Sequence, residues 1–345
     1  MGSMVNLCTL FDSNYLDKGI VLYHSLERVA NDFCLYVLAM NNKCYEVLTD
    51  LNFPYIKPIR LEDFENEKLK EAKGNRSRGE YCWTCSSSLI KYLLSTYNLE
   101  YCTYIDADIC FYQDPQILID EMIFAGASVQ VVEHRFPKGD NRAWRVGTYC
   151  VEFNTFKNDK IGLRILDEWV DKCLECCSQI SDGIHWGDQK YLDPIVEKYS
   201  EHVNVLQNLG GGVAPWNIAQ YKGLFSFGDN IILQEKGSNK VFELVFYHFE
   251  GVKYLNRNKA TAPIYYDSGS NKFITALYSD YFIRIKRAKQ MLLANYGVDF
   301  VIKEHPVMKE FKGDVSYYIK KIVEYILHPQ KFYFKYIDGR CFLEV

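Results

Sequence analysis

The chain has 345 residues, a length that suits one large domain with an extension, or two domains. Apolar residues make up 48% and charged residues 24%, the composition of a folded globular protein, which excludes long disorder, collagen and low-complexity architecture. The 40 Lys and Arg against 44 Asp and Glu give a net charge of -4, so the chain as a whole is not an electrostatic binder of nucleic acid.

The sequence also predicts where the protein works. Residues 1–3 resemble an expression scar, and no charged region followed by an apolar stretch comes after them. No window has 18 consecutive apolar residues, so we expect no membrane span. The 12 cysteines lie partly inside apolar runs, which favours buried free thiols over disulfides. We therefore expect a cytoplasmic protein, with peripheral contact at the inner face of the membrane as an option.

Apolar runs and helical periodicities alternate along the first 250 residues. In an α/β protein such alternation predicts a mainly parallel sheet flanked by helices. The expected strands are 5–11, 33–40, 55–61, 101–105, 128–132, 148–156 and 242–249, and the expected helices are 15–30, 44–51, 84–97, one opening at 114–115, 161–176 and 190–198.

The end of the chain has a different residue composition. Residues 273–295 and 315–336 mix aromatic residues with Lys and Arg, which predicts a helical, basic extension over 266–345. One interpretation is an amphipathic helix pair packed on the domain. The other is a surface for anionic lipid, or a homodimer contact.

Two carboxylates follow a strand that the sequence predicts to be buried. Asp106 and Asp108 are two residues apart in an extended chain, so they point to the same side where strand 101–105 ends. In open α/β sheets that edge binds ligands, and hard divalent cations are held there by one or two carboxylates together with substrate phosphates. The pair therefore predicts a metal-nucleotide site. An EF-hand is excluded, because Phe111 occupies the position of its invariant Gly.

His248 ends the late strand 242–249 and can reach the same sheet edge. An isolated His is more often a satisfied core residue, but imidazole also suits a mixed oxygen and nitrogen metal site. Together with the Asp pair, and with Gly251 three residues later, we interpret His248 as the third metal ligand.

The order of these motifs resembles the GT-A glycosyltransferases of family 8. The resemblance rests on the segments 9–15 (TLFDSNY), 104–108 (YIDAD), 187–189 (GDQ) and 248–251 (HFEG), and covers about residues 4 to 260. It implies a GT-A, Rossmann-like sheet domain over 4–265. It also implies that Thr9, Asp12 and Tyr15 contact uridine. Asp106 and Asp108 would bind Mn2+ (or Mg2+) and ribose, and His248 would bind the same metal. Gly251 and Lys253 would lie at the diphosphate. Lys253 stands one position earlier than the family pattern places its Lys.

The same resemblance places Asp188 and Gln189 at the reacting sugar, although an N-cap role for Asp188 is equally compatible with the helix that follows it. Aromatic rings stack on sugars, so three residues are candidates for contact with an acceptor sugar: His185, Trp186 and Trp216. The weaker candidates are Gly147, Thr148 and Asn154 at the donor sugar and Lys91 at a phosphate.

These observations predict a hexosyltransferase that uses a UDP-sugar, a divalent metal and a glycan or lipid-linked acceptor, and that retains the anomeric configuration. The resemblance implies a role in bacterial-type surface polysaccharide or lipopolysaccharide synthesis. The alternatives are a sugar nucleotidyltransferase, which would be expected to carry a Gly-rich basic loop after the first strand, and a non-catalytic glycan-binding protein on the same fold.

Overall fold

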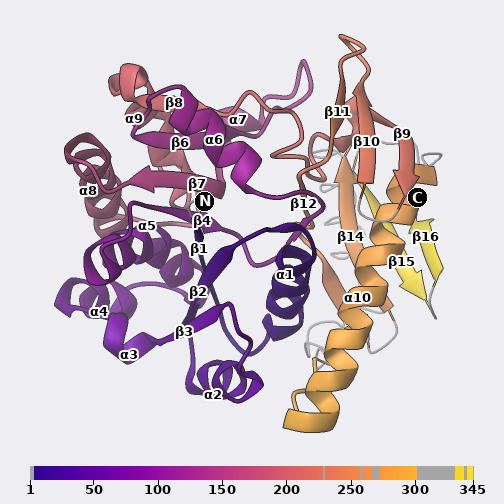
Figure 1. The fold of residues 1–345 in the computed structure, drawn as a ribbon, viewed down its shortest axis with the longest axis horizontal. Helices are drawn as coiled ribbons and strands as arrows, with labels where there is room; N and C mark the ends of the chain where they lie inside the picture. Colours follow the sequence, from indigo (N-terminus) through magenta and orange to yellow (C-terminus); the bar gives the residue numbers. More distant parts are fainter. Residues whose placement is uncertain are drawn as a thin grey trace, which may run out of the picture.

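The computed structural model describes residues 4–227, 230–256, 259–265, 272–300, 331–337 and 340–344. A seven-stranded sheet forms its centre, in the order β3-β2-β1-β4-β7-β6-β8 (Figure 1). Four of its neighbouring pairs are parallel, and only β7 runs antiparallel to its two neighbours. The strands are β1 (Val5–Phe11), β2 (Phe33–Ala39), β3 (Ile56–Arg60), β4 (Tyr101–Ile105), β6 (Val129–Glu133), β7 (Tyr149–Lys157) and β8 (Val203–Val205).

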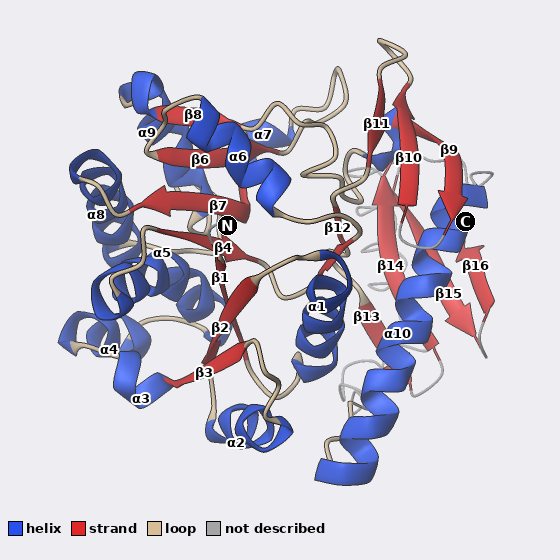
Figure 2. Cartoon of the chain, viewed as in Figure 1, coloured by secondary structure: helices blue, strands red, loops and turns tan. Residues whose placement is uncertain are grey.

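Helices cover both faces of this sheet (Figure 2), which confirms the predicted α/β fold class with a mixed, mostly parallel sheet. One face carries α4 (Glu67–Gly74), α5 (Arg78–Tyr97), α8 (Lys160–Glu175) and α9 (Leu192–Lys198). The other carries α1 (Leu16–Val29), α2 (Asn42–Leu51), α6 (Gln116–Phe124) and α10 (Lys272–Tyr296). Short helical segments connect them: α3 (Leu61–Phe64), α7 (Arg142–Val146) and the 3-10 turns η1 (Gln189–Tyr191), η2 (Ser200–His202) and η3 (Ile218–Gln220).

The predicted strand 242–249 is split in two. Its first part, β11 (Val241–Glu243), joins an antiparallel sheet with β10 (Asn230–Glu235) and β9 (Tyr221–Phe227). Its second part, β12 (Phe246–His248), pairs antiparallel with β5 (Ile109–Phe111) in a register that sets His248 opposite Ile109. Since Ile109 directly follows Asp108, this pairing brings the late His to the end of β4.

The described part of the chain after residue 265 packs on the rest of the domain. Helix α10 lies beside α1 (Figure 2) and buries Tyr278, Tyr281 and Phe282 in the same core as α1. The Tyr281 ring stacks on Phe249 with a centroid distance of 3.7 Å. The predicted helix at 273–295 is therefore confirmed, and it packs on the domain, as the first interpretation expected of one member of its helix pair.

The prediction of helix for the last residues is wrong in the part that the structure describes. β15 (Lys331–Ile337) and β16 (Arg340–Glu344) are strands that continue a sheet begun by β13 (Lys253–Asn256) and β14 (Lys259–Tyr265). The run of aromatic residues from 332 to 334 favours a strand over a helix. Since β14 pairs with β15, the predicted boundary at 265/266 cuts through a sheet. Residues 1–3, and most of the predicted helix 315–336, lie outside the described residues.

Among the helices of the described ranges, none combines the length and the apolar character that crossing a bilayer requires.

Candidate active site

A cavity of about 790 Å³ lies at the carboxyl ends of β1 and β4. The residues that follow these two strands line it, as expected when parallel strands end at one edge of a sheet. The sequence-predicted residues in its wall are Asp12, Tyr15, Asp106, Asp108, Trp186, Gln189, Trp216, His248, Gly251 and Lys253.

The two aspartates and the histidine converge in this wall. His248 Nε2 lies 3.1 Å from Asp108 Oδ1 and 3.6 Å from Asp106 Oδ2. His248 and Asp108 are buried, whereas the Asp106 side chain remains one-third exposed toward the cavity. The predicted grouping of these three side chains therefore holds, although 140 residues separate Asp108 from His248 along the chain.

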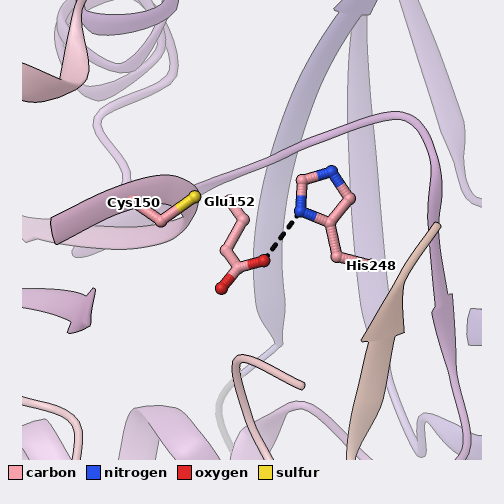
Figure 3. A group of neighbouring side chains, drawn as sticks. All are labelled: Cys150, Glu152 and His248. Carbon is pink, nitrogen blue, oxygen red and sulfur yellow. Dashed lines mark hydrogen bonds and ion pairs between the residues drawn. The ribbon is translucent and has the colours of Figure 1, made fainter. Parts of the chain in front are cut away.

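The other ring nitrogen of His248, Nδ1, contacts the carboxylate of Glu152 in β7 (Figure 3). Glu152 Oε2 lies 2.7 Å from His248 Nδ1, and Glu152 is completely buried. The indole of Trp216 contacts the imidazole edge-on at a centroid distance of 5.4 Å. A carboxylate on one ring nitrogen is the usual support of a metal-binding histidine, because it fixes the tautomer and the ring orientation. Nε2 is thereby directed at Asp106 and Asp108.

These residues fit the divalent cation that the resemblance implies. Two carboxylates and one imidazole nitrogen suit Mn2+, and the carboxylates also suit Mg2+. Cys150, Glu152 and His248 likewise place ligand atoms within 4.8 Å of one another (Figure 3). In that second group, however, burial raises the pKa of the Cys150 thiol well above its ordinary value, and Glu152 already bonds to His248. Asp106, Asp108 and His248 are therefore the set that would hold the metal.

Burial and the neighbouring charges shift the pKa values of Asp106, Asp108 and His248. Burial raises the pKa of Asp106 to about 6. Burial would also raise the pKa of Asp108, but the Lys18 ammonium and the His248 imidazole hold it well below its ordinary value. For His248, burial alone would lower the pKa, whereas the neighbouring Asp108 carboxylate raises it well above 6.5. The buried network is thus arranged around charged Asp108.

The loop after β1 contributes Asp12 and Tyr15 to the cavity. Asp12 forms an ion pair with Arg78 in the first turn of α5, which joins the two sides of this part of the wall. The Lys18 ammonium lies 3.9 Å from the centroid of the Tyr15 ring. Arg78 and Tyr15 thus line the space next to the predicted uridine loop, and Lys18 is buried against the Tyr15 ring.

Asp188 and Gln189 lie in different environments. Gln189 lines the cavity, and its Nε2 donates to the Val146 carbonyl at 2.7 Å. Asp188 is buried behind the wall, accepts a hydrogen bond from Ser86 Oγ at 2.5 Å, and makes no capping bond to η1. Burial raises the pKa of Asp188 to about 7. Of this predicted pair, only Gln189 reaches the space where a sugar could bind.

Aromatic side chains form the far wall. Trp186 lies next to Trp83, with ring centroids 6.5 Å apart, and the Arg145 guanidinium lies 5.3 Å from the Trp186 ring. Trp216 is more constrained, because its Nε1 donates to the His134 carbonyl at 2.9 Å. Trp216 therefore supports His248 and closes the cavity at the same time.

Two residues predicted to contact the nucleotide do not line the cavity. Thr9 is completely buried and does not line the cavity, because the cavity lies at the carboxyl end of β1, where Leu10, Phe11 and Asp12 line it. Lys91 lies on the outer face of α5, where its Nζ is 2.6 Å from Asp167 Oδ1 of α8. In the structure it is therefore a surface ion-pair residue away from the cavity.

Four predicted sugar contacts also fail to reach the cavity. Gly147, with φ of +102°, packs beside the Lys190 backbone, and the Thr148 amide donates to Asp193 Oδ1 at 2.8 Å. Asn154 is buried within β7, and His185 bonds to Asp182 in an outer loop. Local contacts thus hold Gly147, Thr148 and His185 away from the space that they were expected to line, whereas Asn154 is enclosed within β7 without a hydrogen-bond partner for its side-chain amide.

Several residues were not predicted from the sequence: Arg78, Trp83 and Arg145 line the cavity, and Glu152 and Lys18 are buried behind its wall. Glu152 carried a usable signal, since it is a single acid between apolar residues in a strand. Lys18 and Arg78 carried none, because a Lys or Arg in the first turn of a helix resembles any solvated residue. Trp83 and Arg145 likewise depend on tertiary packing.

No protein-family model matches the chain. It is 30% identical over 258 residues to the uncharacterized protein YfnF of Bacillus subtilis (strain 168), an alignment that covers 73% of this chain and 83% of YfnF. It is 28% identical over 291 residues to the uncharacterized protein YfnD of the same organism, covering 83% of this chain and 90% of YfnD.

Among solved structures, the chain is similar to mouse xyloside xylosyltransferase 1, with a TM-score of 0.45 and 14% identity, over 72% of this chain and 98% of that one. It is also similar to an active-site mutant of LgtC, with a TM-score of 0.46 and 14% identity, over 72% of this chain and 88% of that one. Both TM-scores lie below 0.5, so no functional conclusion rests on them.

Proposed function

The chain belongs to the same family as YfnF of Bacillus subtilis, and we propose that it is a metal-dependent glycosyltransferase that moves a hexose from a UDP-sugar to a glycan or glycolipid acceptor. The observation that carries the proposal is the approach of Asp106, Asp108 and His248 Nε2 to one another in the wall of a large cavity at the carboxyl ends of β1 and β4. An acidic metal site at that position of an open sheet suits a nucleotide diphosphate.

The wall divides into regions that match the parts of such a donor. Asp12 and Tyr15 follow β1 and would contact the nucleoside. Lys253 and Gly251 line the cavity close behind His248 in the chain and would lie at the diphosphate. The backbone of Gly251 has φ of +76°, and an added Cβ would lie 2.7 Å from Pro263, so only glycine fits this turn.

Asp106, Asp108 and His248 would hold the cation. When bound, Mn2+ or Mg2+ would supply Lewis-acid stabilisation of the negative charge that develops on the leaving diphosphate. Glu152 keeps the His248 ring in place for this role, and Trp186 offers a flat apolar face to a sugar ring. The aromatic wall therefore supports a saccharide acceptor.

We further propose that the reaction retains the anomeric configuration by attack on the front face of the sugar. The acceptor oxygen forms its bond to C1 while the bond from C1 to the phosphate oxygen breaks, and the departing phosphate takes the acceptor proton. Gln189 lines the cavity with its amide nitrogen bonded to Val146, so its carbonyl oxygen is the atom available to the sugar. Asp188 is bonded to Ser86 behind the wall, which disfavours it as a nucleophile.

The test is incubation of the protein with a panel of UDP-hexoses, Mn2+ and saccharide acceptors, with UDP release as the readout. We expect one donor to be turned over, and Asp108→Asn to lower the rate by about 100-fold or more. Asp167→Asn, on the outer face of α8, is the matched control and should retain the rate. An α product from a UDP-α-sugar, identified by NMR, supports retention, whereas a β product contradicts it.

Two outcomes would favour the alternatives. UDP binding without turnover of any donor would indicate a glycan-binding protein. Formation of pyrophosphate from UTP and a sugar phosphate would indicate a nucleotidyltransferase.

A further inference from the structure

Lys18 is a buried lysine inside the proposed metal site. It lies in the first turn of α1 and is only 3% exposed. Burying an ammonium group is costly unless charged or polar groups compensate it. Its environment therefore has to supply a fixed partner.

That partner is the same carboxylate that we assign to the metal. Lys18 Nζ lies 3.5 Å from Asp108 Oδ2, while His248 Nε2 lies 3.1 Å from Asp108 Oδ1. The two oxygens of Asp108 are thus each next to a basic group. The Tyr15 ring covers the ammonium from the side of the nucleoside loop, with 3.9 Å between Nζ and the ring centroid.

The second carboxylate near Lys18, that of Asp17, has a different partner. Asp17, its neighbour in α1, is buried and accepts a hydrogen bond from Tyr254 of β13 at 2.6 Å. The Lys289 ammonium of α10 lies 3.8 Å from the centroid of the Tyr254 ring. The Asp17 charge is therefore directed at Tyr254 and away from the metal site, which leaves Asp108 as the ion-pair partner of Lys18.

We propose that Lys18 is an internal cation that makes metal binding depend on the nucleotide. In the free protein its charge neutralises Asp108 and repels a divalent ion that enters beside it. A bound nucleoside diphosphate adds negative charge to the same space and offsets that repulsion. The metal then binds tightly only together with the nucleotide. This inference rests on the proposed function, because it assumes that Asp106, Asp108 and His248 form the metal site.

The experiment is calorimetric titration of the full-length protein with Mn2+, with and without saturating UDP. In the wild type we expect UDP to tighten Mn2+ binding at least tenfold. Lys18→Met, which keeps the length of the side chain but removes its charge, should tighten Mn2+ binding to the free protein at least tenfold. Lys18→Arg keeps the charge, and Lys91→Met removes a surface charge from α5, so both should bind Mn2+ as the wild type does.

Equal or weaker Mn2+ binding by folded Lys18→Met would overturn the role of Lys18 and leave the proposed function intact. Folding is checked by circular dichroism and thermal unfolding. If that variant does not fold, Lys18→Gln, which also removes the charge but keeps a polar side chain, is titrated in its place, and Mn2+ binding by it that is equal to or weaker than that of the wild type contradicts the proposal. A wild type that binds no Mn2+ even with UDP would overturn the proposed function as well.

Discussion

Glu152 Oε2 lies 2.7 Å from His248 Nδ1, and both side chains are buried. The contact connects β7 to β12, two strands of different sheets. It directs the other ring nitrogen of His248 to Asp108 and Asp106. The geometry of the proposed metal site therefore depends on a residue that does not itself bind the metal.

Glu152→Gln should weaken Mn2+ binding by about 10- to 100-fold, because the amide no longer fixes the imidazole with a charged hydrogen bond. Isothermal titration in the presence of UDP measures this effect. The exposed Glu201→Gln is the matched control. Equal Mn2+ affinity in Glu152→Gln and the wild type would show that Glu152 does not orient His248.

Asp188 should make the stability of the protein depend on pH. Burial raises the pKa of Asp188 to about 7, whereas the unfolded chain titrates near 4, so the native state binds the proton more tightly. The stability that this group contributes is fully present below about pH 4, and it is lost as the pH rises through about 7.

The Asp188→Asn variant does not titrate. From pH 5 to pH 8 its unfolding free energy should therefore rise relative to that of the wild type, by about 2 to 3 kcal/mol. Urea unfolding at the two pH values measures this difference. If the difference in unfolding free energy between variant and wild type is the same at both pH values, the pKa of Asp188 is not raised in the native state.

Much of the fold could be predicted from the sequence, because buried parallel strands and amphipathic helices leave strong periodic signals. Strands β1, β2 and β4, and the Asp106-Asp108 pair at the end of β4, follow from that pattern. The strands of 331–337 and 340–344 could not be placed, since their pairing with β14 depends on contacts between distant parts of the chain.

The site was predictable only where residues stand next to an obvious strand end. Thr9 and Leu10 are neighbours, and only the position of the cavity at the end of β1 decides that Leu10 lines it and Thr9 does not. Lys91 and Lys18 are both helix lysines, and only tertiary packing separates a surface ion pair from a buried one. Local sequence carries no information of this kind.

Asn217 should be a determinant of stability beside the site. Its buried amide nitrogen donates to the carbonyls of His134 and Gly212, and its oxygen accepts from the Ala214 amide. Asn217→Ala leaves these buried groups unsatisfied, so the free energy of unfolding should fall by about 2 to 4 kcal/mol. Chemical denaturation measures this loss. The exposed Asn295→Ala, as control, should change stability by only about 0.5 kcal/mol. An equally small change in Asn217→Ala would mean that water replaces the lost bonds.

Gln189→Ala should affect the chemical step more than nucleotide binding. Gln189 is the member of the Asp188-Gln189 pair that lines the cavity, so we expect kcat to fall by about 100-fold. The UDP affinity should stay within about twofold of the wild type. Comparison of kcat with the calorimetric affinity for UDP separates the two effects. An unchanged kcat would remove Gln189 from the proposed mechanism.

The most direct test of the proposed site is the affinity for UDP measured by calorimetry with Mn2+ and again with excess chelator. We predict that the wild type binds UDP at least about tenfold more tightly with Mn2+, and that Asp106→Asn and Asp108→Asn lose this difference. UDP binding that is equally tight with Mn2+ and with chelator, or a Mn2+ effect that both variants retain, would contradict the assignment of Asp106, Asp108 and His248 as a metal-nucleotide site.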